Sequence, residues 1–141
     1  MLYYAAIALT ILSSMLYHIL LKLTPAGIHP ALSLVVTYAA AALVCVGMLF
    51  FMPLKTSLTE ALGQLNWASY VLALALVGLE MGFLLSYRAG WRLGITAVVV
   101  TVTVAILLIP IGLLAFKEKP SLVNLAGVLI AIIGLAMMNV K

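Results

Sequence analysis

Charged residues are scarce in this chain, and aspartate is absent. Only 7% of its 141 residues are Asp, Glu, Lys or Arg, whereas 67% are hydrophobic. A soluble domain carries about a quarter charged residues, which cover its surface against water. The low charge content therefore excludes an ordinary soluble globular protein. It indicates that the chain is surrounded by the lipid bilayer.

The cysteine content and the missing motifs exclude further classes. Cys45 is the only cysteine, so it forms no intrachain disulfide and no zinc site, and we interpret it as a small packing residue. The sequence has no phosphate-binding loop, no metal-ligand cluster and no nucleophile–base pair. We therefore expect no enzyme, no cofactor and no metal. The net charge of +4 is spread over segment ends, which is typical of membrane anchoring rather than nucleic-acid binding.

The hydrophobic residues form five long runs, each close to the ~20 residues that a membrane-spanning helix needs. The runs cover residues 2–21, 31–52, 67–87, 93–116 and 122–140. Prolines and glycines interrupt the chain after the first run, and Pro53 ends the second. The sequence therefore predicts an all-α integral membrane protein of five transmembrane helices in one domain, residues 1–141.

Local patterns refine this prediction. In the long loop, Ser57 and Glu60 have the spacing of a capping box, which predicts a short interfacial helix with Glu60 as a cap. Residues 98–104 are rich in β-branched side chains, but hydrocarbon surroundings favour a helix, because an open strand would leave its backbone polar groups unpaired. Pro110 predicts a kink in the fourth span, which serves either packing or a functional hinge.

The positive charges do not fix one orientation. The face that follows the first span receives Lys22, Arg88, Arg92 and Lys141. The opposite face receives Lys55, Lys117 and Lys119. Four against three is too even for the positive-inside rule. Either the chain inserts both ways round or another signal decides; in a single orientation, the face with Lys22 would be cytoplasmic.

Glu80 is the acidic residue that lies inside a predicted span, about two turns from its end. An ionised side chain at such a depth costs ~2.5–3.5 kcal/mol on insertion scales and usually faces a cavity or a partner. A carboxyl group in this setting is suited to bind and release protons. We interpret Glu80 as a proton or cation site on a transport path. The alternative is a carboxyl group that only packs against another helix through a hydrogen bond.

The first span supplies candidate neighbours for Glu80. Ser14, His18 and Lys22 follow one another at intervals of four residues and share one helix face. The first and third spans cross the membrane in the same direction, which puts Ser14, Tyr17 and His18 near the depth of Glu80. His18 titrates near physiological pH, so it is the candidate partner of Glu80. Lys22 is interpreted as an anchor that reaches the interface.

Small residues predict close helix packing in two spans. Gly78 and Gly82 flank Glu80 at a spacing that lets another helix approach. Gly127 and Gly134 form a similar stripe in the last span. These stripes favour contacts between helices, including contacts between subunits. Thr96 and Thr103 share a face of the fourth span, where they line a path or bond back to their own helix.

The C-terminal part resembles a known superfamily. Residues 94–97 are followed by a long apolar helix, a short loop with Glu118, and a helix with Gly127 and Gly134. This pattern resembles the repeat unit of EamA-like transporters in the drug/metabolite transporter superfamily. More distantly, it resembles the last two helices of small multidrug resistance proteins, in which the last helix forms the dimer contact. The resemblance implies half of an inverted-repeat transporter fold.

The departures from the small multidrug resistance pattern are specific. Those proteins have four helices and an essential glutamate in the first, where this chain has Ser14. Their aromatic substrate residues correspond here to valines at 98–100. The resemblance therefore does not carry over their drug-cation site, and the five-helix EamA-like repeat is the better fit.

A single repeat needs a second copy, because such transporters place the substrate between two inverted repeats. The odd helix count and the even charge balance suit an antiparallel homodimer. We therefore expect a proton-coupled secondary transporter of a small metabolite in the cytoplasmic (inner) membrane of a bacterium or archaeon. Glu80, Ser14, Tyr17 and His18 would line its path, with Pro110 as a hinge. Two alternatives remain: a non-transporting subunit of another complex, such as a lipid-carrier flippase, and a small-multidrug-type cation exporter.

Overall fold

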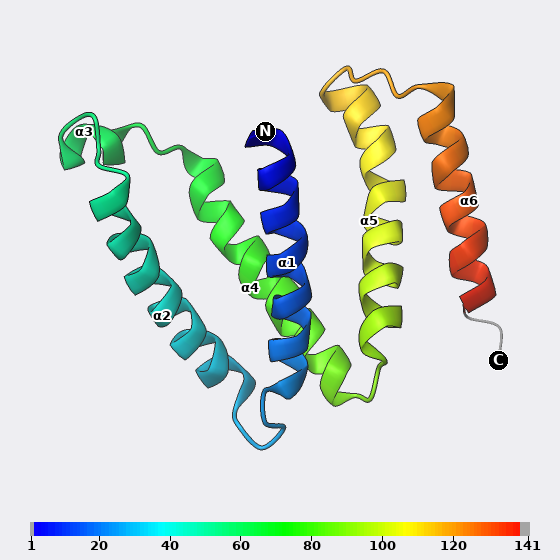
Figure 1. Ribbon diagram of the computed structural model, residues 1–141, viewed down its shortest axis with the longest axis horizontal. Helices are drawn as coiled ribbons and strands as arrows, with labels where there is room; N and C mark the ends of the chain where they lie inside the picture. The colour runs from blue at the N-terminus through cyan, green and yellow to red at the C-terminus, as the bar shows by residue number, and fades with distance from the viewer. Residues whose placement is uncertain (1, 139–141) are drawn as a thin grey trace. The chain divides into compact units, whose positions relative to one another are not determined.

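The computed structural model describes residues 2–138, and 82% of the chain is helical with no strand among those residues. The helices are α1 (Leu2–Leu23), α2 (Pro30–Phe51), α3 (Leu58–Gly63), α4 (Trp67–Arg88), α5 (Leu93–Ala115) and α6 (Leu122–Met138) (Figure 1). The prediction of an all-α chain is confirmed for these residues. The valine-rich stretch 98–104 is helical, as the membrane argument required.

Four helices are long and apolar enough to cross a membrane: α1, α2, α4 and α5. They match the first four predicted spans closely at both ends. Helix α6 has 17 described residues, which correspond to about 25 Å of helix, against about 30 Å of bilayer hydrocarbon. The last two residues of the fifth predicted span, 139 and 140, lie outside the described residues. Four helices are therefore candidate spans by length and composition, and the fifth span stays a prediction.

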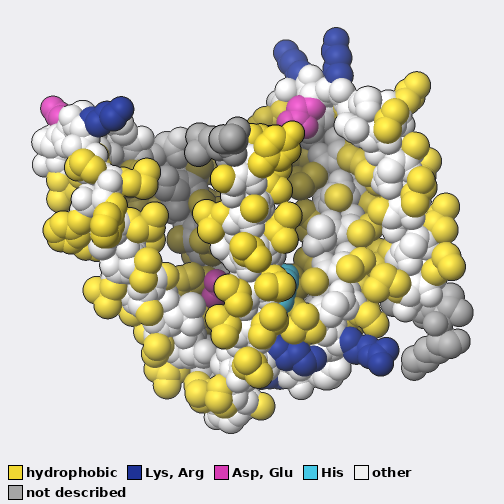
Figure 2. All heavy atoms as spheres, in the orientation of Figure 1, with side chains coloured by type: hydrophobic (Ala, Val, Ile, Leu, Met, Phe, Trp, Pro, Cys, Tyr) yellow, Lys and Arg dark blue, Asp and Glu magenta, His cyan; other side chains and the backbone are white. Residues whose placement is uncertain are grey.

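The surface of the helices is that of a membrane protein. Hydrophobic side chains cover the helix flanks, and Lys and Arg gather at helix ends (Figure 2). Many large hydrophobic residues are exposed along α1 and α2, including Leu9, Leu43 and Val35. In water these side chains would be unfavourable, whereas lipid tails are as apolar as the side chains themselves.

The chain divides into two compact units, residues 1–89 and 90–141. The single domain expected from the sequence stays a prediction. In the first unit, α4 contacts both α1 and α2. Helices α1 and α4 run in the same direction, as predicted, and α2 runs the opposite way (Figure 1). The buried side chains of this unit are Leu34, Phe83, Leu84 and Tyr87. Three of them belong to α4, which is therefore its central helix.

Side-chain caps explain where α3 and α4 begin. The backbone N–H of Glu60 donates to Ser57 Oγ at 3.3 Å, and the N–H of Ser57 donates to Glu60 Oε2 at 3.2 Å. The predicted capping box and its short helix, α3, are confirmed. Asn66 Oδ1 accepts the N–H of Ala68 at 2.9 Å and starts α4. Glu60 is thus a structural cap.

The second unit is a hairpin of α5 and α6, which contact each other. Helix α5 continues through Pro110 as a single helix from Leu93 to Ala115. After α5, the N–H groups of Phe116 and Glu118 both donate to the carbonyl oxygen of Gly112, at 3.2 and 3.0 Å. Lys117 between them has φ +54°, the left-handed conformation that commonly ends a helix. These bonds set the tight turn into the loop before α6.

Candidate functional site

Aromatic side chains of α1 and α4 pack together in the first unit. Tyr17 and His18 on α1 meet Phe83 and Tyr87 on α4, and we call these four residues the α1–α4 cluster. The ring of Phe83 lies 4.8 Å from His18 and 6.1 Å from both Tyr17 and Tyr87, measured between ring centroids. Phe83 and Tyr87 are four residues apart, so they share one face of α4. The cluster fixes the register of α1 against α4.

His18 has a defined hydrogen-bond partner. Its Nδ1 atom lies 3.0 Å from the hydroxyl oxygen of Tyr87. The sequence suggested Glu80 as the partner of His18, and the structure corrects this. The two helices pack so that His18 lies beside Phe83 and Tyr87, which are about one to two turns further along α4 than Glu80. The imidazole therefore belongs to the aromatic contact.

Two cationic side chains hold the end of this packing region. The ammonium group of Lys22 lies 5.5 Å from the centre of the Tyr87 ring, within the range of a cation–π contact. The guanidinium group of Arg88 donates to the carbonyl oxygen of Pro25 at 3.2 Å, so the end of α4 is tied to the α1–α2 loop. Lys22, predicted as an interface anchor, thus also packs on the cluster.

Glu80 is half-buried and interacts with tyrosines from two helices. Its carboxyl group acts electrostatically on the hydroxyl groups of Tyr17, on α1, and Tyr38, on α2. Tyr38 also interacts with Glu80 through a side-chain hydrogen bond, in a geometry looser than that of a regular hydrogen bond. Both hydroxyl groups are buried without a regular hydrogen-bond partner among the described residues. A buried hydroxyl group without a partner is costly, and it is satisfied when a water molecule or ligand binds beside it.

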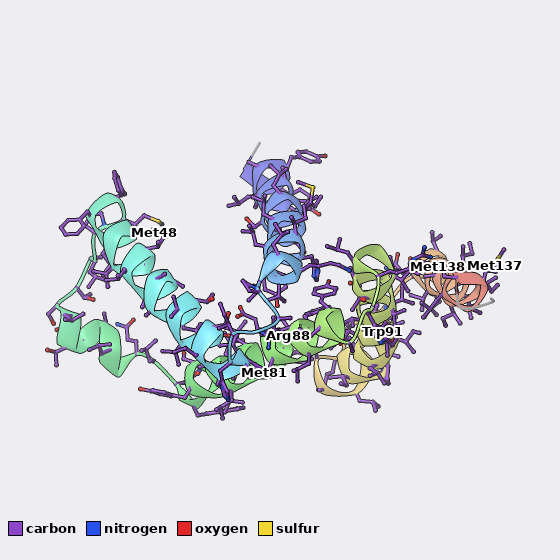
Figure 3. All side chains as sticks on the ribbon, turned by 90° about the horizontal axis from the view of Figure 1, so that it is seen from below. Met48, Met81, Arg88, Trp91, Met137 and Met138 are labelled. Carbon is purple, nitrogen blue, oxygen red and sulfur yellow. The ribbon has the colours of Figure 1, made fainter. Side chains whose placement is uncertain are left out.

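An apolar pocket adjoins this carboxyl site. It lies between α2 and α4 and has a volume of about 390 Å³. Its lining residues are Ala31, Leu34, Val35, Tyr38, Val77 and Met81. Met81, which follows Glu80 on α4, lies beside the first turns of α2 (Figure 3). Tyr38 lines the pocket and also interacts with Glu80, so it links the carboxyl group to the pocket wall, although Glu80 itself does not line the pocket.

Sequence reasoning placed some site residues well and missed others. Tyr17, predicted as a neighbour of Glu80, interacts with it electrostatically, whereas Ser14 is exposed; the binding roles of Glu80, Ser14, Tyr17 and His18 stay predictions. Phe83, Tyr87 and Tyr38 were missed. The first two follow Glu80 at intervals of three and seven residues, a helix-face signal that could have identified them. No signal in the sequence links Tyr38 to Glu80, because only the packing of α2 on α4 brings them together.

The predicted packing residues are open in the structure. A Cβ atom at Gly78, Gly82, Gly127 or Gly134 would meet no described atom within 4 Å. Within each unit, no described residue packs closely on either glycine stripe, and contact between subunits stays a prediction. Pro110 is exposed. Thr96 Oγ1 donates to the carbonyl oxygen of Arg92 at 2.8 Å, so for Thr96 the bond back to its own helix is confirmed.

The chemistry of the site is that of a carboxylate with hydroxyl neighbours. Among the described residues, no three His, Cys, Asp or Glu side chains come together. Glu80 can bind a proton or a cation, and the tyrosine hydroxyl groups beside it can donate hydrogen bonds to its ionised form. A search of protein-family models found no match to this sequence, and searches of curated proteins and of solved structures found no significant one.

Proposed function

We propose that this protein is a proton-coupled secondary transporter of a small metabolite, with Glu80 as the proton site. One observation carries the proposal. A carboxyl group inside an apolar helix interacts with two buried tyrosine hydroxyl groups that make no regular hydrogen bond among the described residues, next to an apolar pocket. Acidic groups at membrane depth typically mark proton relays and substrate paths.

The proposed cycle uses the residues around Glu80. The protonated, neutral carboxyl group is compatible with the apolar pocket, and the ionised form left after proton release would bind the next proton. Tyr17 and Tyr38 would donate hydrogen bonds to the ionised form and so lower its cost in the membrane. Binding and release of the proton would therefore be coupled to a change in the polarity of the site.

The proposed assembly is an antiparallel homodimer of five-helix, EamA-like subunits in the cytoplasmic membrane. The near-even charge distribution and the open glycine stripes support it. In such a dimer the two copies would supply the inverted repeats that a transporter of this kind needs. Rocking of one copy against the other would give alternating access.

The test of this proposal is transport into proteoliposomes under an imposed pH gradient. A panel of metabolites is screened with the wild type, and Glu80→Gln is then compared for each substrate that moves. Because Gln cannot bind or release the coupled proton, we expect gradient-driven uptake to fall at least about tenfold, the range of general acid–base contributions. Exchange without a gradient should be less affected.

Glu60→Gln is the matched control. It makes the same chemical change in the capping box, where Gln also serves at this position, and we expect normal uptake. If Glu80→Gln folds and transports as well as the wild type under the gradient, Glu80 is not the proton site.

Glu80→Gln also distinguishes the proposed transporter from the main alternative, a non-transporting subunit of another membrane complex. A subunit that only stabilises another membrane complex would tolerate Glu80→Gln as long as it assembled, because no proton would have to move. Copurification of an unrelated membrane protein with both forms, together with no uptake of any substrate by the wild type, would favour the subunit role.

A further inference from the structure

The α5–α6 hairpin contains a second pocket, separate from the Glu80 site. It has a volume of about 320 Å³, and helix α5, the loop and the start of α6 line it. Leu108, Ile109 and Leu113 form its apolar side, and Glu118, Lys119 and Asn124 form its polar side. The apolar side lies on the last turns of a membrane-length helix, and the polar side lies where that helix ends. The pocket therefore crosses from the depth of lipid tails to the depth of headgroups.

The polar side carries one charge of each sign. Glu118 and Lys119 are neighbours in the loop and both line the pocket, and no ion pair joins them in the described part of the chain. The carbonyl end of α5 reinforces attraction for a cation, and the N-terminal end of α6 reinforces attraction for an anion. The pocket thus offers separate places for a positive and a negative group.

Gly112 holds the carboxylate in position. The carbonyl oxygen of Gly112 accepts the N–H of Glu118 at 3.0 Å. The Glu118 side chain lies so close that a Cβ atom on Gly112 would be 2.7 Å from its Oε2 atom. Gly112 is buried. The absence of a side chain at this position is what allows the carboxylate to rest against the end of α5 at the pocket.

We propose that this pocket binds a zwitterionic phospholipid with a primary amine in its headgroup, of the phosphatidylethanolamine type. Its ammonium group would donate hydrogen bonds to the Glu118 carboxylate. Its phosphate would bind Lys119 and Asn124, and one acyl chain would lie along Leu108 and Leu113. An anionic lipid without an amine fits less well, because the carboxylate at the pocket repels it. This site does not depend on the transport activity.

The first experiment needs no variant. Native mass spectrometry of the detergent-solubilised protein measures binding of dioleoyl lipids that differ only in the headgroup. Phosphatidylethanolamine should bind about fivefold more tightly than phosphatidylcholine, the effect of about one net hydrogen bond. The mono- and dimethylated headgroups should lie between them, because each methyl group removes one N–H donor.

Variants locate the site. Glu118→Gln should remove the preference for ethanolamine over choline, whereas Lys119→Gln should weaken both lipids about equally. Gly112→Ala should act like Glu118→Gln, because the added methyl group displaces the carboxylate. Glu60→Gln and Lys55→Gln make the same changes in the other long loop and should alter nothing.

Two results would overturn the proposal. One is equal binding of ethanolamine, methylated and choline headgroups by the wild type. The other is a preference for ethanolamine that persists in folded Glu118→Gln protein. Tightest binding of phosphatidylglycerol, lost in Lys119→Gln, would assign the pocket to an anionic lipid instead.

Discussion

At the scale of single residues, Tyr87 combines a hydrogen bond, a ring contact and a cation–π contact in the α1–α4 cluster. Its hydroxyl group bonds to His18, its ring stacks on Phe83, and Lys22 lies over its face. It is also buried. A polar group in this position must find a partner, because an unpaired hydroxyl group away from water is costly. Tyr87 thus positions His18 and so links α1 to α4.

Replacement of Tyr87 by Phe tests this role. The change removes only the hydroxyl group and leaves the imidazole of His18 without its partner, so we expect a loss of about 1 kcal/mol of stability. The measurement is unfolding in mixed micelles followed by circular dichroism.

Tyr70→Phe is the control for Tyr87→Phe. Tyr70 lies on the same helix but is 68% exposed, and its change should leave the stability unaltered. Equal stability of Tyr87→Phe and Tyr70→Phe would show that the bond to His18 contributes nothing.

At the scale of elements, the turn after α5 depends on one glycine. The carbonyl oxygen of Gly112 accepts two N–H groups from the loop, and the Glu118 side chain rests against its α-carbon. An alanine at 112 would gain helix propensity of up to about 1 kcal/mol. It would also force the flexible carboxylate away. We therefore expect Gly112→Ala to remain folded while Glu118 leaves its position.

A double-mutant cycle measures this contact. Gly112→Ala should cost about 1 kcal/mol more in the wild type than in a Glu118→Ala background, where no carboxylate is in the way. Unfolding in mixed micelles supplies the four stabilities. Gly94→Ala serves as the control, since a Cβ atom there meets only open space. A coupling energy of zero would mean that the Glu118 side chain is not held against Gly112.

At the scale of the whole molecule, the proposed antiparallel dimer requires insertion in both orientations, which the near-even charge distribution permits. Cysteines placed at Lys55 and at Arg92, each in a Cys45→Ser background, report the two faces. A membrane-impermeant maleimide applied to intact cells should label about half of the molecules at each position. Labelling of one position in full and of the other not at all would establish one orientation and remove the antiparallel dimer.

A substitution in the glycine stripe on α6 tests whether this stripe forms the dimer contact. Gly127→Leu should weaken self-association by at least about tenfold, or 1.4 kcal/mol, because a large side chain keeps another helix from approaching. Gly47→Leu is the matched control, since Gly47 is equally open and lies on α2, outside the stripe. The measurement is the monomer–dimer equilibrium in detergent by analytical ultracentrifugation. An unchanged equilibrium in both variants would remove Gly127 from the contact.

The sequence by itself determined the class and the helices. The lengths of the apolar runs, and the proline and glycine residues between them, determine where the helices form. These properties depend on neighbouring residues and on the surrounding lipid, not on how the helices pack together. The capping box of Ser57 and Glu60 was predicted for the same reason. The sequence also singled out Glu80, since a charge inside a long apolar run is rare and costly.

Only the tertiary structure decided which groups meet. The register of α1 against α4 pairs His18 with Tyr87 rather than with Glu80. The packing of α2 on α4 brings Tyr38 close to Glu80. It also leaves the glycine stripes open. In apolar helices many faces look alike, so periodicity alone does not select the packed one. Side-chain shape at the contact selects it, and shape is expressed only when the helices are assembled.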